Sequence, residues 1–126
     1  MSAKPTVMIV EDDQYLLSLY AKKFGDADFI VYSARDGMTA LRNLEKYHPQ
    51  AVVVDLNIPE LSGWDLLEMI AVSPMPKPIC VILSNYDRTT AQENNTIPDI
   101  VKDYFVKINT DPEELVQKIK SYISKN

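Results

Sequence analysis

Residues 51–63 have the sequence AVVVDLNIPELSG, and this stretch decides the fold. Its first four residues, Ala51–Val54, are apolar and mostly β-branched, a pattern typical of a strand buried on both faces of a parallel sheet. The strand ends at Asp55, so this carboxylate should lie at the carboxyl edge of the sheet, where open α/β proteins bind ligands. Pro59 favours an extended chain just before it, and Ser62 can cap a following helix. We therefore expect Asp55 at a rigid edge, facing a crevice between loops.

The rest of the chain alternates between strand and helix patterns. Apolar spacing and capping residues predict four clear helices and one that is short or frayed. The expected strands cover residues 6–10, 29–33, 51–54, 79–83 and 103–106. The expected helices cover residues 14–24, 36–47, 62–71, part of 87–99 and 111–123, with Gly25 stopping the first and Tyr47 on the inner face of the second. This alternation predicts an α/β protein with a doubly wound, five-stranded parallel sheet of order 2-1-3-4-5, flavodoxin-like, with helices on both faces.

Length and composition restrict the class of protein. The 126 residues fit one domain, and we expect this domain to cover 1–126 with no second domain. A formal net charge of −5 argues against nucleic acid and against an anionic membrane as partners. Residues 1–6 hold no apolar signal core, and no apolar run is long enough to span a bilayer. The single cysteine, Cys80, lies inside an apolar run, which fits a buried thiol in a reducing, cytoplasmic setting.

Polar side chains follow four of the expected strands. Glu11 and Asp12 come after the first strand, Asp55 after the third, Ser84 at the end of the fourth and Lys107 after the fifth. The first and third strands are neighbours in this order, about 4.8 Å apart, so the three carboxylates should cluster. Clustered carboxylates repel one another unless a cation offsets them, and their oxygens suit Mg²⁺. The sequence therefore predicts a magnesium site at this edge.

The same edge suits phosphoryl transfer. An ammonium and a hydroxyl, those of Lys107 and Ser84, can hold the oxygens of a transferred phosphoryl group. With the charge offset in this way, the Asp55 carboxylate can act as a nucleophile and become an acyl phosphate. Asp13 is expected to cap the following helix rather than to bind metal.

Four motifs together resemble a known family, the receiver domain of two-component response regulators, including the single-domain, chemotaxis-type regulators. They are Ile9–Asp13, Asp55–Gly63, Ile82–Ser84 and Tyr104–Lys107. Each motif alone is weak, but their order and spacing are specific, and the resemblance covers essentially the whole chain.

The resemblance implies a set of roles. Asp55 would accept a phosphoryl group from a sensor histidine kinase or a histidine phosphotransfer protein. Mg²⁺ would be surrounded by Glu11, Asp12, Asp55 and the backbone carbonyl of Asn57. The chain would be a regulator rather than an enzyme, with self-catalysed phosphoryl transfer and autodephosphorylation.

The resemblance also implies a switch. Ser84 and Tyr104 would move together on phosphorylation and reshape the face made by the fourth helix, the fifth strand and the fifth helix. A downstream protein target would bind that face. Asn57 and Tyr86, each two residues past a site residue, would tune the rate of dephosphorylation.

The sequence departs from the family pattern in three places. Ile108 follows Lys107, where the family usually has proline in a cis peptide. A cis bond before isoleucine would cost about 2.5–4 kcal/mol, so we expect a trans peptide and a shifted loop. Ile100–Lys102 replace the common Gly-Ala before the fifth strand, and Pro98 interrupts the fourth helix.

Two other functions compete with the signalling switch. A pseudo-receiver would be an interaction module that is never phosphorylated. A Mg²⁺-dependent phosphatase with an aspartyl nucleophile would want a second acid two residues after Asp55, where this chain has Asn57. Nucleotide binding is disfavoured because the three glycines cannot build a phosphate-cradling loop. His48 is expected on the surface, and Trp64 in ordinary packing close enough to Asp55 for its fluorescence to respond to metal.

Overall fold

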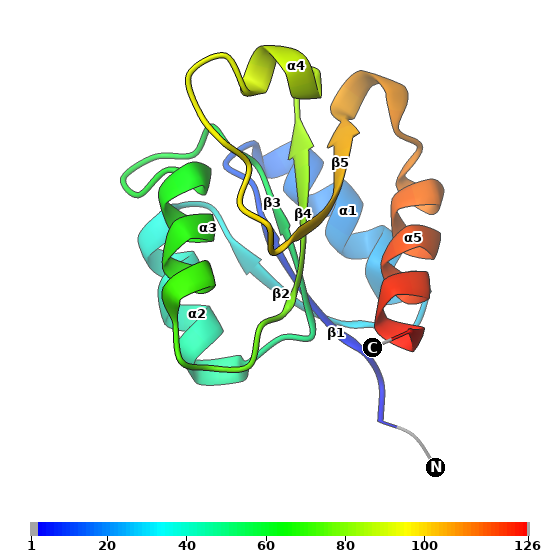
Figure 1. The fold of residues 1–126 in the computed structure, drawn as a ribbon. Coiled ribbons are helices and arrows are strands. Elements are labelled where there is room, and N and C mark those ends of the chain that lie inside the picture. Colours follow the sequence, from blue (N-terminus) through cyan, green and yellow to red (C-terminus); the bar gives the residue numbers. More distant parts are fainter. Residues whose placement is uncertain (1–2, 126) are drawn as a thin grey trace.

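The computed structural model describes residues 3–125, and a five-stranded parallel sheet lies at its centre (Figure 1). The strands are β1 (Thr6–Val10), β2 (Ile30–Ala34), β3 (Ala51–Val54), β4 (Ile79–Ser84) and β5 (Val101–Val106). They are ordered β2-β1-β3-β4-β5, and every neighbouring pair is parallel. The predicted class and strand order are confirmed. The start of the segment 1–6 and the last residue lie outside the described part.

Helices cover both faces of the sheet. They are α1 (Gln14–Asp26), α2 (Gly37–Tyr47), α3 (Gly63–Val72), α4 (Arg88–Ala91) and α5 (Pro112–Ser124), with a 3₁₀ turn η1 (Lys107–Asn109) after β5. In Figure 1, α2 and α3 lie on one side of the sheet, α1 and α5 on the other, and α4 lies beyond the carboxyl ends of the strands. Of the described helices, none has the length and apolar character needed to cross a membrane.

Alternate residues of each central strand enter two separate cores, as the twofold repeat of a strand requires. In β1, Val7 and Ile9 pack with the inner faces of α1 and α5, while Met8 and Val10 pack with those of α2 and α3. All four residues of β3 are buried, as its unbroken apolar sequence predicts. This burial on both faces makes the carboxyl end of β3 a rigid support for Asp55.

Two predictions about helix residues are wrong. Gly25 does not stop the first helix, which continues to Asp26; the left-handed residue that follows the helix is Asp28, at φ 67°. Tyr47 is not on an inner face but is 40% exposed, and its ring stacks on Tyr32 at 4.3 Å between centroids. Strand boundaries also differ: β2 is shifted by one residue and β5 begins two residues early, at Val101.

The region before β5 is the least regular part of the fold. As expected, its helix is short: α4 has four residues, capped by the Asp87 side chain, which accepts a hydrogen bond from the Thr90 N–H. The chain then runs through a loop in which Ile97 is only 8% exposed and packs into the core beneath α2 and α3. Polar residues of low helix propensity and Pro98 account for the early end of α4.

Candidate functional site

The carboxyl ends of β1 and β3 bring Glu11 and Asp55 side by side. Val10 pairs with Val54 in the sheet, and the Asp55 N–H donates a 3.0 Å hydrogen bond to the Val10 carbonyl. Glu11 is held from the other side, because its N–H donates to the Ala34 carbonyl of β2 at 3.0 Å. Both carboxylates are therefore placed by sheet hydrogen bonds, immediately beyond the last paired residues.

Lys107 joins these two carboxylates. Its ammonium Nζ lies 2.8 Å from Asp55 Oδ2 and 2.6 Å from Glu11 Oε1, and all three side chains are at most one-tenth exposed. No cis peptide occurs within residues 3–125, so the Lys107–Ile108 bond is trans, as predicted. The η1 turn begins at Lys107, and the lysine reaches Asp55 without a following proline.

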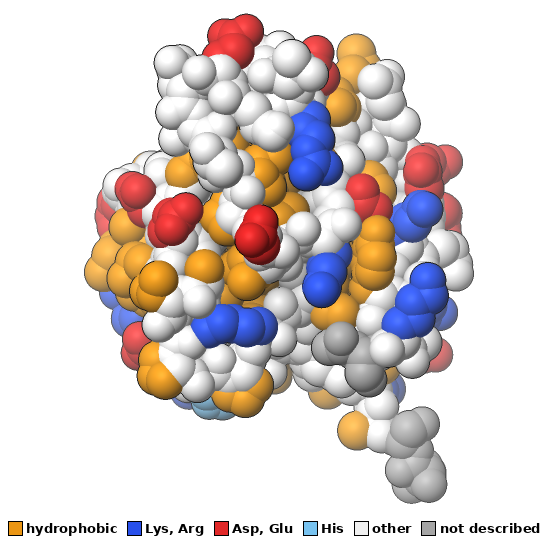
Figure 2. Space-filling model, in the orientation of Figure 1, with side chains coloured by type: hydrophobic (Ala, Val, Ile, Leu, Met, Phe, Trp, Pro, Cys, Tyr) orange, Lys and Arg blue, Asp and Glu red, His pale blue; other side chains and the backbone are white. Residues whose placement is uncertain are grey.

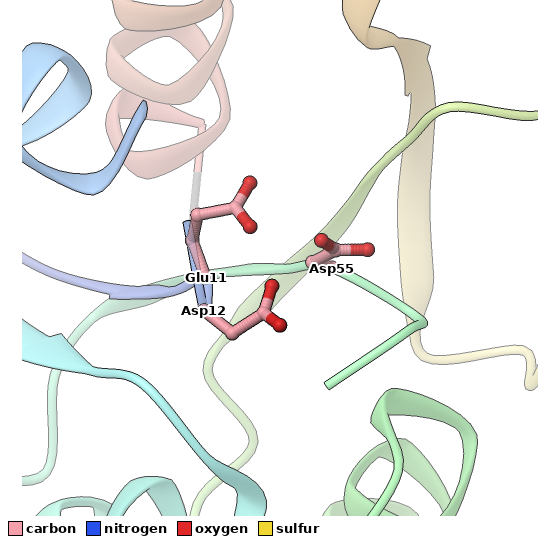
Figure 3. A group of neighbouring side chains, drawn as sticks. All are labelled: Glu11, Asp12 and Asp55. Carbon is pink, nitrogen blue, oxygen red and sulfur yellow. The ribbon is translucent and has the colours of Figure 1, made fainter. Parts of the chain in front are cut away.

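Three acids gather at this edge in the arrangement that the sequence predicts. Carboxylate oxygens of Glu11, Asp12 and Asp55 all lie within 4.8 Å of one another. Figure 3 shows Glu11 and Asp12 extending from the end of β1 beside Asp55. Asp13 is separate, since its Oδ1 accepts a hydrogen bond from the Leu16 N–H and caps α1.

The electrostatics of the cluster favour a cation. Burial raises the pKa of the Glu11 carboxyl from 4.5 to about 7, against the effect of Lys107 and with a further increase from the Asp55 charge. The pKa of Lys107 is also raised, because the two carboxylates outweigh the effect of its burial. Glu11 Oε1 is in ion-pair contact with the Lys107 ammonium and accepts no hydrogen bond from any other group of the described chain. Clustered carboxylate oxygens of this kind fit Mg²⁺.

The loop after Asp55 returns to the carboxylate. The Asn57 N–H donates a 3.1 Å hydrogen bond to Asp55 Oδ1, which turns the chain directly beyond β3. Glu60 has a positive φ of 66° and completes the turn, and Ser62 caps α3 by accepting from the Asp65 N–H. Oδ1 and Oδ2 of Asp55 are thus held by different partners, the loop and Lys107.

Ser84 and Tyr104 are linked through the backbone of Tyr86. Ser84 is 2% exposed at the end of β4, and its Oγ accepts a 3.1 Å hydrogen bond from the Tyr86 N–H. The Tyr104 hydroxyl donates a 2.5 Å hydrogen bond to the Tyr86 carbonyl. Burial raises the pKa of the Tyr104 hydroxyl, so it is a donor at neutral pH. The Tyr86 backbone therefore joins Ser84 and Tyr104 through two hydrogen bonds.

Two cavities lie at opposite ends of the sheet. One of about 510 Å³ opens at Asp55 and is lined by Asn57, Trp64, Ser84 and Tyr86, with residues of α4 and the loop after it. A larger one, about 660 Å³, lies between α2, α3 and the loop before β4, on the side where hydrophobic side chains gather in Figure 2. It contains none of the predicted site residues, so the smaller cavity belongs to the candidate site.

One contributor was missed by the sequence analysis. Arg35 follows β2 and donates hydrogen bonds of 2.9 and 3.3 Å to the backbone carbonyl of Asp12. The Arg35 side chain therefore holds the backbone in place at Asp12, one of the three clustered acids. Its position at the end of the strand next to β1 was the available signal, since it follows from the order 2-1-3-4-5.

The fold and this edge define a class of protein: a doubly wound α/β domain with an acidic cluster, a lysine and a hydroxyl at its switch point. Comparison with known families narrows the class. Residues 7–120 match the family model described as the response regulator receiver domain. The chain belongs to this family.

Curated relatives agree with this assignment. The chain is 28% identical over 124 residues to the transcriptional regulatory protein PrrA of Mycobacterium leprae, covering 96% of the chain and 51% of that protein. It is 33% identical over 89 residues to a protein-glutamate methylesterase/protein-glutamine glutaminase of Rhodospirillum rubrum, covering 69% of the chain and 24% of that protein. The chain thus spans about half the length, or less, of these relatives.

Solved structures share the fold. The receiver domain of Francisella response regulator 1452 superposes with a TM-score of 0.86 at 23% identity, covering 97% of this chain and 98% of that one. The receiver domain of a LuxO repressor from Vibrio parahaemolyticus gives 0.81 at 22% identity, covering 98% and 92%. These similarities establish the architecture of the chain as that of a CheY-like receiver domain.

Proposed function

We propose that this chain is a phosphoacceptor switch in which Asp55 takes a phosphoryl group from a histidine of a sensor histidine kinase or a histidine phosphotransfer protein. The observation that carries the proposal is the position of the Lys107 ammonium, 2.8 Å from Asp55 Oδ2, with Glu11 and Asp12 beside it. Membership of the receiver family supports it. We also propose that the switch acts in the cytoplasm.

The transfer needs an in-line attack on phosphorus. A carboxylate oxygen of Asp55 forms the new P–O bond while the P–N bond to the donor histidine breaks, and the imidazole leaves with the electron pair and takes up a proton. Lys107 offsets the charge of Asp55 and of the transferred group, and the Ser84 hydroxyl can donate to a phosphoryl oxygen. These preorganised donors supply electrostatic stabilisation.

Glu11, Asp12, Asp55 and the backbone carbonyl of Asn57 would hold Mg²⁺. When bound, the ion supplies charge neutralisation at the phosphoryl oxygens. Support for this ligand set comes from the clustered carboxylates and from the burial of Glu11.

The output follows from the Ser84 to Tyr104 link. A phosphoryl group on Asp55 draws the Ser84 hydroxyl toward it, and the hydrogen bond from the Tyr86 N–H to Ser84 Oγ is then given up or moved. The Tyr104 side chain, whose hydroxyl donates a hydrogen bond to the Tyr86 carbonyl, moves with Tyr86. This movement reshapes the face of α4, β5 and α5. A downstream protein target binds this face. Asn57 and Tyr86 border the cavity at Asp55, which supports a role for both in setting the rate of autodephosphorylation.

The test is intact-mass analysis after incubation with acetyl phosphate, with and without Mg²⁺. Wild type should gain one phosphoryl group only when Mg²⁺ is present, and Asp55→Asn should gain none. No gain under any condition would favour the unphosphorylated pseudo-receiver. Multiple turnover of varied phosphoesters would indicate a phosphatase instead.

A further inference from the structure

The loop that follows Asp55 is held from outside by the start of α2. Gly37, the first residue of α2, is buried, and its N–H donates a 3.3 Å hydrogen bond to the Pro59 carbonyl. A Cβ on Gly37 would overlap the carbonyl oxygen of Leu61 and lie 2.5 Å from Leu61 Cβ and 2.7 Å from its carbonyl carbon. The end of the loop therefore rests directly on the backbone of Gly37.

The beginning of the loop is held in a similar way by α3. The Gly63 N–H donates to the Leu56 carbonyl at 3.1 Å, and a Cβ on Gly63 would overlap the Asp55 carbonyl oxygen and lie 2.7 Å from Leu56 Cα. Asn57 lies between the two contacts, and its N–H donates to Asp55 Oδ1. A shift at either contact would be passed along a short chain segment to Asn57.

We propose that Gly37 is a positioning residue for the phosphorylation site: by letting Pro59 and Leu61 rest on the start of α2, it sets where the Asn57 carbonyl lies relative to the Asp55 carboxylate. The proposal rests on the proposed function in one respect, that this carbonyl binds Mg²⁺. Gly37 is far from Asp55 in sequence and contacts the loop at Pro59 and Leu61, so it acts through the loop.

A methyl group at position 37 would move the loop rather than the helix. The helix start is fixed, because the Asp36 side chain accepts a 2.7 Å hydrogen bond from the Thr39 N–H. Ala40 and Leu44 are buried against the sheet and hold the rest of α2. The atoms of Leu61 that such a methyl would overlap include backbone atoms, so rotating a side chain cannot relieve the overlap.

The test compares Gly37→Ala with Gly25→Ala, in which a new Cβ meets no atom within 4 Å. Metal-free ¹H–¹⁵N spectra should show shifted amides over Leu56–Ser62 in Gly37→Ala and not in Gly25→Ala. Mg²⁺ titration, followed by the fluorescence of the single tryptophan, Trp64, should give a dissociation constant about 10-fold or more higher for Gly37→Ala. Gly25→Ala should bind Mg²⁺ as wild type does.

Three results would decide whether Gly37 positions the loop. A folded Gly37→Ala with unchanged loop amides and unchanged Mg²⁺ affinity would overturn the proposal. If Gly37→Ala does not fold, the double variant Gly37→Ala with Leu61→Gly takes its place. Leu61→Gly removes one of the overlapping atoms, Leu61 Cβ, and frees the backbone at position 61 to move away from the new methyl group, so the double variant should fold with shifted loop amides. Failure of the double variant to fold would also overturn the proposal. Wild type without any Mg²⁺ response, together with shifted loop amides in Gly37→Ala, would refute the proposed metal site and leave the role of Gly37 in place.

Discussion

Nζ of Lys107 lies 2.8 Å from Oδ2 of Asp55, although isoleucine rather than proline follows the lysine. This ion pair reaches from the end of β5 to the end of β3, past the end of β4, which lies between them in the sheet. It is nearly buried, and the same ammonium contacts Glu11. The Lys107 ammonium therefore connects the carboxyl ends of β1, β3 and β5. The phosphorylation site proposed at Asp55 is thus preformed without a cis peptide.

Removal of this charge should abolish most phosphoryl transfer. We expect Lys107→Met to slow phosphorylation of Asp55 by acetyl phosphate by about 100-fold or more, because a preorganised charge at the reacting group is lost. The rate is measured by intact mass against time. Lys102→Met, which changes an exposed lysine on β5, is the matched control and should react at the wild-type rate. Equal rates for all three proteins would contradict the role of Lys107.

Asp12 offers the simplest test of the metal site. Asp12 is exposed, so Asp12→Asn should fold normally, yet it should weaken Mg²⁺ binding by about 10-fold or more because one of three clustered carboxylates is lost. The readout is Trp64 fluorescence, since this side chain lines the cavity at Asp55. Asp13→Asn is the control: its Oδ1 can still cap α1, so both stability and Mg²⁺ affinity should stay near the wild-type values.

Cys80 should make stability depend on alkaline pH. Burial raises the pKa of its thiol from 9.0 to about 12, so the unfolded thiol ionises before the folded one. The contribution of the neutral, buried Cys80 thiol to the free energy of unfolding is fully present below pH 9.0. It is lost progressively as the pH rises through about 12. Urea unfolding should show a steeper alkaline loss of stability in wild type than in Cys80→Val. Parallel curves for the two proteins would contradict the buried-thiol account, as would fast reaction of the native thiol with a disulfide reagent.

Tyr104 should contribute modestly to stability and not at all to metal binding. Tyr104→Phe removes the hydrogen bond to the Tyr86 carbonyl, so the free energy of unfolding should fall by about 1 kcal/mol. Mg²⁺ affinity and the rate of Asp55 phosphorylation should stay at the wild-type values, because the hydroxyl contacts neither carboxylate nor lysine. A large loss of phosphorylation in Tyr104→Phe would place the hydroxyl in the reacting site instead.

Much of this arrangement follows from residue order alone. Unbroken apolar strands that end in acids were sufficient to predict that β1 and β3 are neighbours and that Glu11, Asp12 and Asp55 meet. The sheet order then places Lys107 on the same edge. These features depend on local patterns and on a few rules of parallel-sheet topology.

The features that escaped prediction depend on contacts between distant segments. Gly25 looked like a helix stop, but another residue takes the left-handed position. The spacing of Tyr47 along the helix predicts a core position, yet its ring stacks on Tyr32 at the surface. The backbone contacts of Arg35 with Asp12 and of Gly37 with Leu61 arise only once loops from different strands meet, and no local pattern encodes them.

We propose above that Asp55 is the residue that becomes phosphorylated. The most direct measurement is borohydride reduction of protein treated with acetyl phosphate and Mg²⁺, followed by peptide mapping, because reduction marks an acyl phosphate permanently. The reduced residue should be at position 55 and at no other acid, and no residue should be reduced when Mg²⁺ is omitted. A label at Glu11 or Asp12, or no label in protein that binds Mg²⁺, would contradict it.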